Sequence, residues 1–234
     1  METLIALLGI ILGGVLVGIC VHFIPASAVG AMSASTGIAT GPSMLSAGAG
    51  MAALLSASYS IHDGFYVVLA SGAAGSTLMM VLTIMGSNIV NAFGTGVAPA
   101  SGQTASCKGI IKKTKDAISG WDQKPYISPG TDGHGVPVQA HVSGIIGAMI
   151  GGTGGALVLF AVYSLLSQKY ETAYTISGFI SAGIFLINCV LPAYTLVGKT
   201  EGMFDQKIKK IPSTSVSCLI VSSAIALIIY IGAK

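Results

Sequence analysis

Long apolar stretches without charged residues alternate with short polar segments along most of this chain. Six of these stretches are long enough to be membrane-spanning helices: residues 3–23, 26–58, 65–92, 142–167, 173–197 and 213–231. About 20 apolar residues in a helix cross the ~30 Å hydrocarbon core of a bilayer. The pattern therefore predicts an all-α, polytopic integral membrane protein in which residues 1–234 form a single membrane domain.

The second stretch is longer than one straight crossing requires. Its 33 residues (26–58) would form a helix of about 50 Å at 1.5 Å per residue. Gly41 and Pro42 lie inside it, and a proline within a helix removes an amide donor and clashes with the preceding turn. The segment must tilt strongly, extend past the membrane interface, or break. A discontinuous or re-entrant helix around Gly41 and Pro42 is among the expected forms.

Two polar segments hold most of the charge. Residues 94–141 separate the third and fourth stretches, residues 198–212 separate the fifth and sixth, and together they carry nine of the eleven lysines. Six crossings place both segments on one side, and the positive-inside rule makes that side the cytoplasm, with both termini outside. If the second stretch re-enters instead of crossing, the two loops still share a side but their relation to the N-terminus reverses.

The amino-acid composition indicates which environment and which partners the chain has. Only 8% of residues are charged and mean hydropathy is +0.82, whereas soluble domains carry roughly 25% charged residues, so the lipid bilayer is the main environment. Every basic residue is lysine, which removes the bidentate recognition that arginine provides and argues against a nucleic-acid partner. The scattered cysteines show neither a zinc-binding spacing nor a disulfide framework, and are expected to pack as small buried groups.

Glycines recur at four-residue spacing in two of the predicted spans. Small residues at this spacing create flat helix faces on which a second backbone can approach closely. The predicted packing positions are Gly9 and Gly13 in the first span and Gly147, Gly151 and Gly155 in the fourth. A phosphate-binding loop is the rival interpretation of residues 151–155, but the stretch lies in an apolar run without a flanking lysine.

The sequence offers no catalytic constellation and no carboxylate within a span. Neutral oxygen ligands are nevertheless present at depth, and hard cations bind such oxygens where a helix is interrupted. Candidates for a Na⁺ path are Asn88, Asn91, Asn188 and Thr77, each of which could instead form a hydrogen bond between packed helices. Two ionisable groups at span edges, His22 and Asp63, are weaker candidates, and His22 is expected to reach toward the interface or to bond a carbonyl.

One loop segment, residues 129–137, is dense in glycine and proline around a single acid and a single imidazole, Asp132 and His134. Such a constrained loop suits a docking or gating element that couples this chain to a partner. A well-capped turn without further function is the alternative interpretation.

Several segments together carry a resemblance to a known family. They are Val21-His22-Phe23-Ile24-Pro25, Ala74-Gly75-Ser76, residues 129–137, Val142-Ser143-Gly144-Ile145-Ile146-Gly147, and Glu201-Gly202 with Asp205 and the lysines that follow. Over its whole length the chain resembles the D subunit of tetrahydromethanopterin S-methyltransferase, the Na⁺-translocating membrane methyltransferase of methanogenic archaea.

The resemblance implies a role within a larger complex. In that family a methyl group passes from a tetrahydropterin to a corrinoid held by the A subunit and then to coenzyme M, and the transfer drives Na⁺ export. This chain is then expected to bind no cofactor and to have no catalytic residue. It would lie beside the C and E membrane subunits, help to form or scaffold the Na⁺ path, and face the A subunit through its basic loops. The alternatives are a free-standing secondary transporter and a purely structural membrane subunit.

Overall fold

The computed structural model describes residues 2–24, 42–89, 138–196 and 202–233, and this part of the chain contains helices and no strand. The long helices are α1 (Glu2–Phe23), α3 (Pro42–Tyr59), α4 (Phe65–Ile89), α5 (Val138–Leu166), α6 (Ala173–Leu196) and α7 (Ile211–Ala233). Two short 3₁₀ helices, η3 (Gly202–Phe204) and η4 (Gln206–Lys210), precede α7. The prediction of an all-α chain is confirmed.

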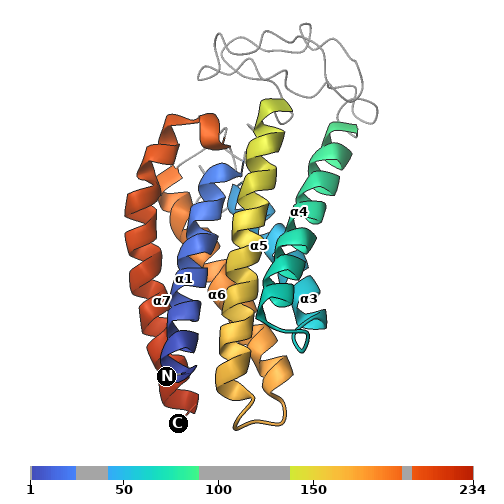
Figure 1. Cartoon of the computed structure of the whole chain (residues 1–234). Helices are drawn as coiled ribbons and strands as arrows, with labels where there is room; N and C mark the ends of the chain where they lie inside the picture. The colour runs from blue at the N-terminus through green and yellow to red at the C-terminus, as the bar shows by residue number, and fades with distance from the viewer. Residues whose placement is uncertain (1, 25–41, 90–137, 197–201, 234) are drawn as a thin grey trace, which may run out of the picture.

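The long helices run in alternate directions through one bundle, with α5 packed against α1, α3, α4 and α6 (Figure 1). The start of α1 and the end of α7 lie together at one end, which we call the terminal end. The end of α4, the start of α5, and η3 with η4 lie at the opposite end, the loop end (Figure 1). The described helices therefore meet both polar segments at the same end of the bundle.

Within the described part of the chain, five helices are long and apolar enough to cross a membrane, and they coincide with five of the six predicted spans. They include Thr3–Phe23, Phe65–Thr83, Val142–Leu166, Ala173–Leu196 and Gln206–Ala233. These helices confirm the polytopic membrane architecture.

The predicted second span is represented by α3, which is not among these five helices. Its 18 residues, rich in serine and glycine, give a helix of about 27 Å. It begins at Pro42, where the missing amide of proline costs nothing because the first amides of a helix have no partner within it. Residues 26–41 lie outside the described part of the chain, so a break or re-entrant turn there stays a prediction.

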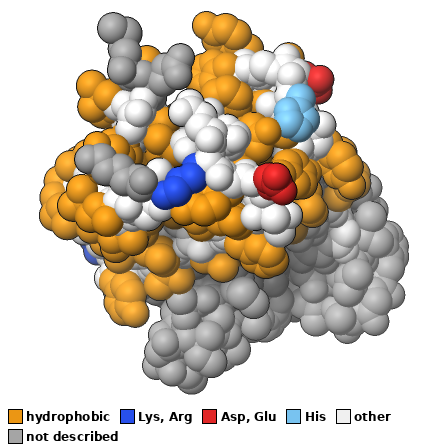
Figure 2. Space-filling model, turned by 90° about the horizontal axis from the view of Figure 1, so that it is seen from below, with side chains coloured by type: hydrophobic (Ala, Val, Ile, Leu, Met, Phe, Trp, Pro, Cys, Tyr) orange, Lys and Arg blue, Asp and Glu red, His pale blue; other side chains and the backbone are white. Residues whose placement is uncertain are grey.

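Large apolar side chains point outward along the helices, as lipid contact requires. On α1 they include Leu4, Leu8 and Leu12, each one turn from the next. Figure 2 views the terminal end, where hydrophobic side chains surround a small number of charged ones.

Gly9 and Gly13, two of the predicted packing positions, lie where α1 contacts α5. A Cβ atom added at Gly9 would lie 3.0 Å from the Cβ of Ala161, and one added at Gly13 would lie 2.6 Å from the backbone oxygen of Gly154. The distance at Gly13 leaves no room for a side chain and brings the two backbones into contact, whereas Gly9 packs tightly against the side chain of Ala161.

The three predicted glycines of α5 face two different neighbours. A Cβ at Gly147 or Gly151 would meet Cys20 of α1, at 2.9 Å from its carbonyl oxygen and 2.6 Å from its sulfur respectively. A Cβ at Gly155 would lie 2.9 Å from the ring of Phe185, which is buried in the larger apolar cluster. At each of these three positions, atoms of a neighbouring helix occupy the space that a side chain would need.

Candidate functional site

Small and polar residues face one another in register between α1 and α7. On each helix they are spaced four residues apart, and the two helices run antiparallel, so every residue of one row meets one residue of the other. The three pairs are Gly14 with Ser222, Gly18 with Cys218, and His22 with Thr214. Together with Asn188 and Thr195, which α6 adds from the side, we call this set the polar ladder.

His22 forms the end of the ladder nearest the loop end and is fully buried. Its Nε2 lies 2.8 Å from the hydroxyl of Thr214, which lies 3.0 Å from the hydroxyl of Thr195, and Thr195 donates to the Pro192 carbonyl at 2.8 Å. Either hydroxyl can donate in the Thr214–Thr195 contact, and the tautomer of His22 decides in which direction the protons point. The buried ring of His22 contacts the Thr214 hydroxyl and also interacts with the backbone of Lys207.

Asn188 occupies the deepest position of the ladder and is also fully buried. Its amide nitrogen donates to the Ile184 carbonyl at 2.9 Å, and its side-chain oxygen accepts from the Ser222 hydroxyl at 3.2 Å. A Cβ atom at Gly14 would collide with Ser222 Oγ, so α1 presses its bare backbone against this pair. Of the four predicted Na⁺ candidates, Asn188 is the one that the structure places in the ladder.

The ladder extends well into the bundle. His22 lies in the last turn of α1 and Gly14 lies eight residues earlier, which corresponds to about 12 Å along the helix. Since a hydrocarbon core is ~30 Å thick, Asn188 and Ser222 lie close to the middle of a membrane that the bundle spans. The ladder is therefore a row of neutral polar groups leading from the loop end toward the midplane.

A second polar contact fixes the loop end beside the ladder. The hydroxyl of Ser143, in the first turns of α5, donates to the carbonyl of Phe23 at 2.6 Å and accepts from the amide of Met203 at 2.7 Å. Gly202 has a φ of +67°, and a Cβ atom there would collide with both Ser143 Oγ and the Phe23 carbonyl. We call Phe23, Ser143, Gly202 and Met203 the loop-end latch, because they hold η3 against α1 and α5.

The segment that follows the latch returns to the ladder. Asp205 accepts from the Lys207 amide at 2.9 Å and so caps η4. Lys210 then donates to the backbone carbonyl of Thr195 at 2.7 Å, near the end of α6, where helix carbonyls lack amide partners. A movement of this lysine-rich segment would thus reach Thr195 and Thr214 directly.

The other sequence-predicted residues lie elsewhere or outside the described structure. Thr77 is on α4, which packs against α3 and α5, and its hydroxyl is buried without a hydrogen-bond partner among the described residues. Asp63 is exposed in the turn between α3 and α4. The side chain of Asn88, and all of Asn91, Asp132 and His134, lie outside the described structure.

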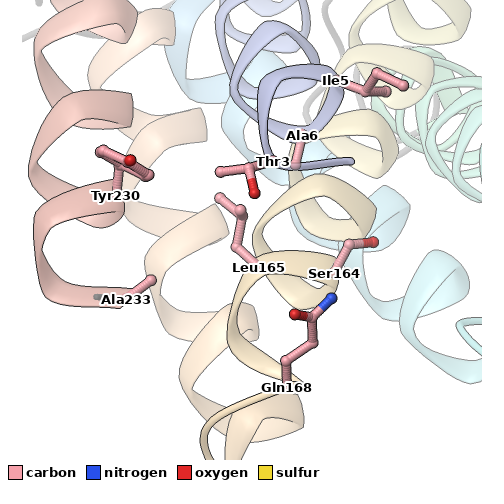
Figure 3. Close-up of a pocket in the computed structure, with 8 residues that line it drawn as sticks. All are labelled: Thr3, Ile5, Ala6, Ser164, Leu165, Gln168, Tyr230 and Ala233. Atoms are coloured by element: carbon pink, nitrogen blue, oxygen red, sulfur yellow. The ribbon is translucent and has the colours of Figure 1, made fainter. Parts of the chain in front are cut away.

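The described residues contain no group of three or more His, Cys, Asp or Glu side chains that could hold a metal ion. Cys20, Cys189 and Cys218 are free and buried, as predicted for small packing groups. A separate cavity of about 440 Å³ opens at the terminal end, between α1, α5 and α7 (Figure 3). The described side chains that line it are neutral, among them Thr3, Gln168 and Tyr230.

Comparison with known proteins places the whole chain in one family. The model of the family described as the D subunit of tetrahydromethanopterin S-methyltransferase matches residues 3–222. The chain belongs to this family. The D subunit from Methanopyrus kandleri is 38% identical over 232 residues, covering 98% of this chain and 97% of the relative. The one from Methanothermobacter marburgensis is 39% identical, covering 95% and 93%, and that from Methanosarcina barkeri is 37% identical, covering 94% and 90%.

Membership of the D-subunit family confirms the resemblance and makes the protein part of a multi-subunit methyltransferase. Three of the segments that carried the resemblance meet in the loop-end latch: Phe23 from the first, Ser143 from the fourth and Gly202 from the fifth. These residues, which carried the family resemblance, therefore hold η3 against α1 and α5 at the loop end.

Sequence reasoning did not single out Ser222, Thr214 or Thr195. A usable signal existed, because Thr214, Cys218 and Ser222 repeat every four residues on α7 just as Gly14, Gly18 and His22 do on α1. Small residues facing hydroxyl-bearing residues at the same period favour close antiparallel packing with buried polar contacts.

Proposed function

We propose that this chain helps to form or scaffold the Na⁺ path of the methyltransferase complex and has no catalytic activity of its own. In that complex a methyl group passes from methyl-tetrahydropterin through a corrinoid to coenzyme M, and the energy released drives Na⁺ out of the cell. The observation that carries the proposal is the polar ladder, a row of neutral hydrogen-bonding groups that reaches from the loop end to about the middle of the membrane.

The chemistry of the ladder suits a monovalent cation. Amide, hydroxyl and carbonyl oxygens are the ligands that hard cations use where no carboxylate is available. Polar groups in a membrane interior are costly unless they are paired, and groups that face the interior of a helix bundle commonly mark an ion path. Because the ladder contains no acid, a countercharge for Na⁺ would come from a partner subunit.

The cofactors belong to other subunits in this proposal. Corrinoid is held by the A subunit, tetrahydropterin and coenzyme M are bound by the methyl-transfer subunits, and the C and E membrane subunits lie beside this chain. The lysine-rich segment before α7 supports a docking role for the loop end. With the positive-inside rule, that end faces the cytoplasm and both termini face outward.

Coupling would operate at the loop end. A methyl-transfer subunit that binds the basic loops more tightly in one conformation would shift this chain toward that conformation. Asp132 and His134 are the proposed contact residues of the larger loop, and the contacts from Met203 to Ser143 and from Lys210 to Thr195 connect the smaller loop to the ladder. Unchanged Na⁺ coupling after neutralising Asp132 and His134 together would contradict their role.

The proposal is tested by purifying the chain, with a tag, under gentle detergent extraction. The copurifying proteins are identified by mass spectrometry, and methyl transfer to coenzyme M is assayed with and without Na⁺. Recovery of a methyltransferase complex with Na⁺-stimulated activity, and Na⁺ uptake after reconstitution into vesicles, is the expected result. Transport by the chain alone, after conditions that keep other membrane complexes intact, would instead make it a free-standing secondary transporter.

A purely structural subunit is the second candidate, and the close glycine contacts between α1 and α5 favour it. Such a subunit would support a Na⁺ path built entirely by its partners. Substituting the described ladder residue Asn188, together with Asn88 and Asn91, would then leave Na⁺ dependence unchanged, whereas substitutions on the glycine faces would abolish assembly. The same measurements therefore separate the two functions.

A further inference from the structure

We propose that Asn188 and Ser222 form a coordination site for Na⁺ within this chain. The site consists of three neutral oxygens: the backbone carbonyl of Asn188, its side-chain oxygen, and the hydroxyl of Ser222. This inference rests on the proposed function, since it names the place where the Na⁺ path would use residues of this chain.

Pro192 leaves the backbone carbonyl oxygen of Asn188 without its helical hydrogen bond. In an α-helix the carbonyl of residue i accepts from the amide of residue i+4, which for Asn188 is residue 192. Pro192 lies inside α6 and has no amide hydrogen, so the Asn188 carbonyl lacks its helical donor. The carbonyl instead contacts the thiol of Cys218 at 3.9 Å, and a thiol is a weak donor. A buried carbonyl is thereby left with capacity for a stronger partner.

The remaining oxygens lie on the same side of α6. The side-chain oxygen of Asn188 faces Ser222 of α7, and its backbone carbonyl faces Cys218, one turn from Ser222 on the same helix. Both oxygens of one residue thus point into the contact between α6 and α7. A cation there would displace the 3.2 Å hydrogen bond, and the Ser222 hydroxyl would turn a lone pair toward the ion.

The ligand set and its depth favour Na⁺ over a divalent ion. Calcium and magnesium sites rely on carboxylates, and the described ladder contains none. Helices interrupted near the bilayer midplane present freed carbonyls to Na⁺ in membrane transporters, and Asn188 lies at about that depth. Three protein oxygens leave coordination positions for water or for a group of a neighbouring subunit.

The ladder supplies an approach to this site. The hydroxyls of Thr214 and Thr195 lie between the loop end and Asn188, with His22 buried beside them. Gly14 and Gly18 let α1 pack closely against α7 here, so passage of an ion requires these two helices to separate. An ion entering from the loop end would meet neutral hydroxyl oxygens before it reached the proposed site.

Pro192→Ala in the intact complex tests the freed carbonyl without touching any side chain of the site. Alanine restores an amide that donates to Asn188, which occupies the carbonyl. We expect the Na⁺ concentration giving half-maximal methyl transfer to rise by at least about tenfold, as when a metal site loses a supporting group. Binding of radioactive Na⁺ to the purified complex, measured without substrates, should weaken by the same factor, and Ser222→Ala should act in the same direction.

Asn188→Asp provides a variant with the opposite expected effect. A carboxylate at the site should lower the half-maximal Na⁺ concentration, which loss of packing alone would not do. Ser217→Ala is the matched control, because the Ser217 hydroxyl bonds its own helix at Ser213, in an exposed position, and its loss should leave Na⁺ affinity unchanged.

These measurements distinguish failure of the proposed site from failure of the proposed function. A wild-type complex without Na⁺-dependent methyl transfer or Na⁺ binding would overturn the proposed function. A Na⁺-dependent wild type whose affinity is unaltered by Pro192→Ala and Ser222→Ala would overturn the site alone. If Pro192→Ala prevents assembly, Ser222→Ala, which removes a single oxygen atom, decides the question by the same two measurements.

Discussion

Gly13 and Gly154 face each other so closely that neither position can hold a side chain. A Cβ atom on Gly13 would lie 2.6 Å from the Gly154 carbonyl oxygen, and one on Gly154 would lie 2.7 Å from the Gly13 carbonyl oxygen. Since both obstacles are backbone atoms, no rotamer change relieves the clash. We expect Gly13→Ala to destabilise the chain by about 1–3 kcal/mol, the usual cost of overpacking. The thermal stability of the purified complex measures this loss.

Gly183→Ala on α6 is the control for that substitution. Nothing lies within 4 Å of a Cβ atom at Gly183, so alanine there meets open space. Its higher helix propensity should leave stability unchanged or raised by up to about 1 kcal/mol. Equal destabilisation by the two variants would contradict the claim that close approach of α1 to α5 is what position 13 requires.

Gly13 also shows how far sequence reasoning reaches. The four-residue spacing identified its helix face, but not its partner, because such spacing fits many combinations of helix, depth and direction. Asn188 was identified because an amide in an apolar run is conspicuous. Ser222, its partner, was not, since serine is common in these helices and the four-residue repeat that contains Ser222 does not identify the neighbouring helix.

The loop end was the least predictable region. Residues 198–212 were predicted as a basic loop, whereas the described part forms η3 and η4 and is held by Ser143. That contact depends on a hydroxyl some 60 residues away in sequence, and no local pattern encodes such a pairing. Asp132 and His134 lie outside the described structure, so their coupling role stays a prediction.

The Thr214 hydroxyl should contribute measurably to stability. Thr214→Val keeps the shape of the side chain but leaves His22 Nε2 and the Thr195 hydroxyl without this partner. Burying a polar group without its hydrogen bond costs about 1–3 kcal/mol, so the complex should unfold at a lower temperature. Thr214→Ser, which keeps the hydroxyl, should lose less.

Thr153→Val serves as the comparison for Thr214→Val. The Thr153 hydroxyl bonds the Met149 carbonyl of its own helix, at 2.8 Å and in an exposed position. Thr153→Val should therefore lower the unfolding temperature of the complex less than Thr214→Val does. A Thr214→Val complex that melts like the Thr153→Val complex would show that the hydroxyl does not link α1, α6 and α7.

Ser143→Ala should release η3 from the bundle. The variant leaves the Phe23 carbonyl and the Met203 amide without the hydroxyl that joins them. Hydrogen–deuterium exchange of residues 202–210, read by mass spectrometry, should become faster, because exchange reports local opening. Ser164→Ala, also on α5 but bonded within its own helix to Phe160, should leave exchange in this segment unaltered. Protection that persists in Ser143→Ala would mean that other contacts hold η3.

Comparing alanine substitutions at Gly202 and Gly64 distinguishes the effect of backbone strain from the effect of close packing in the loop-end latch. Both have positive φ, +67° and +103°, which L-amino acids with a side chain adopt at a cost of roughly 1–3 kcal/mol. A Cβ atom at Gly64 meets nothing within 4 Å, whereas one at Gly202 collides with Ser143 Oγ and the Phe23 carbonyl. We therefore expect Gly202→Ala to lower thermal stability more than Gly64→Ala, and Gly202→Ala alone to accelerate exchange of residues 202–210. If both variants destabilise equally and leave that exchange unchanged, close contact between η3 and the end of α1 is not what position 202 requires.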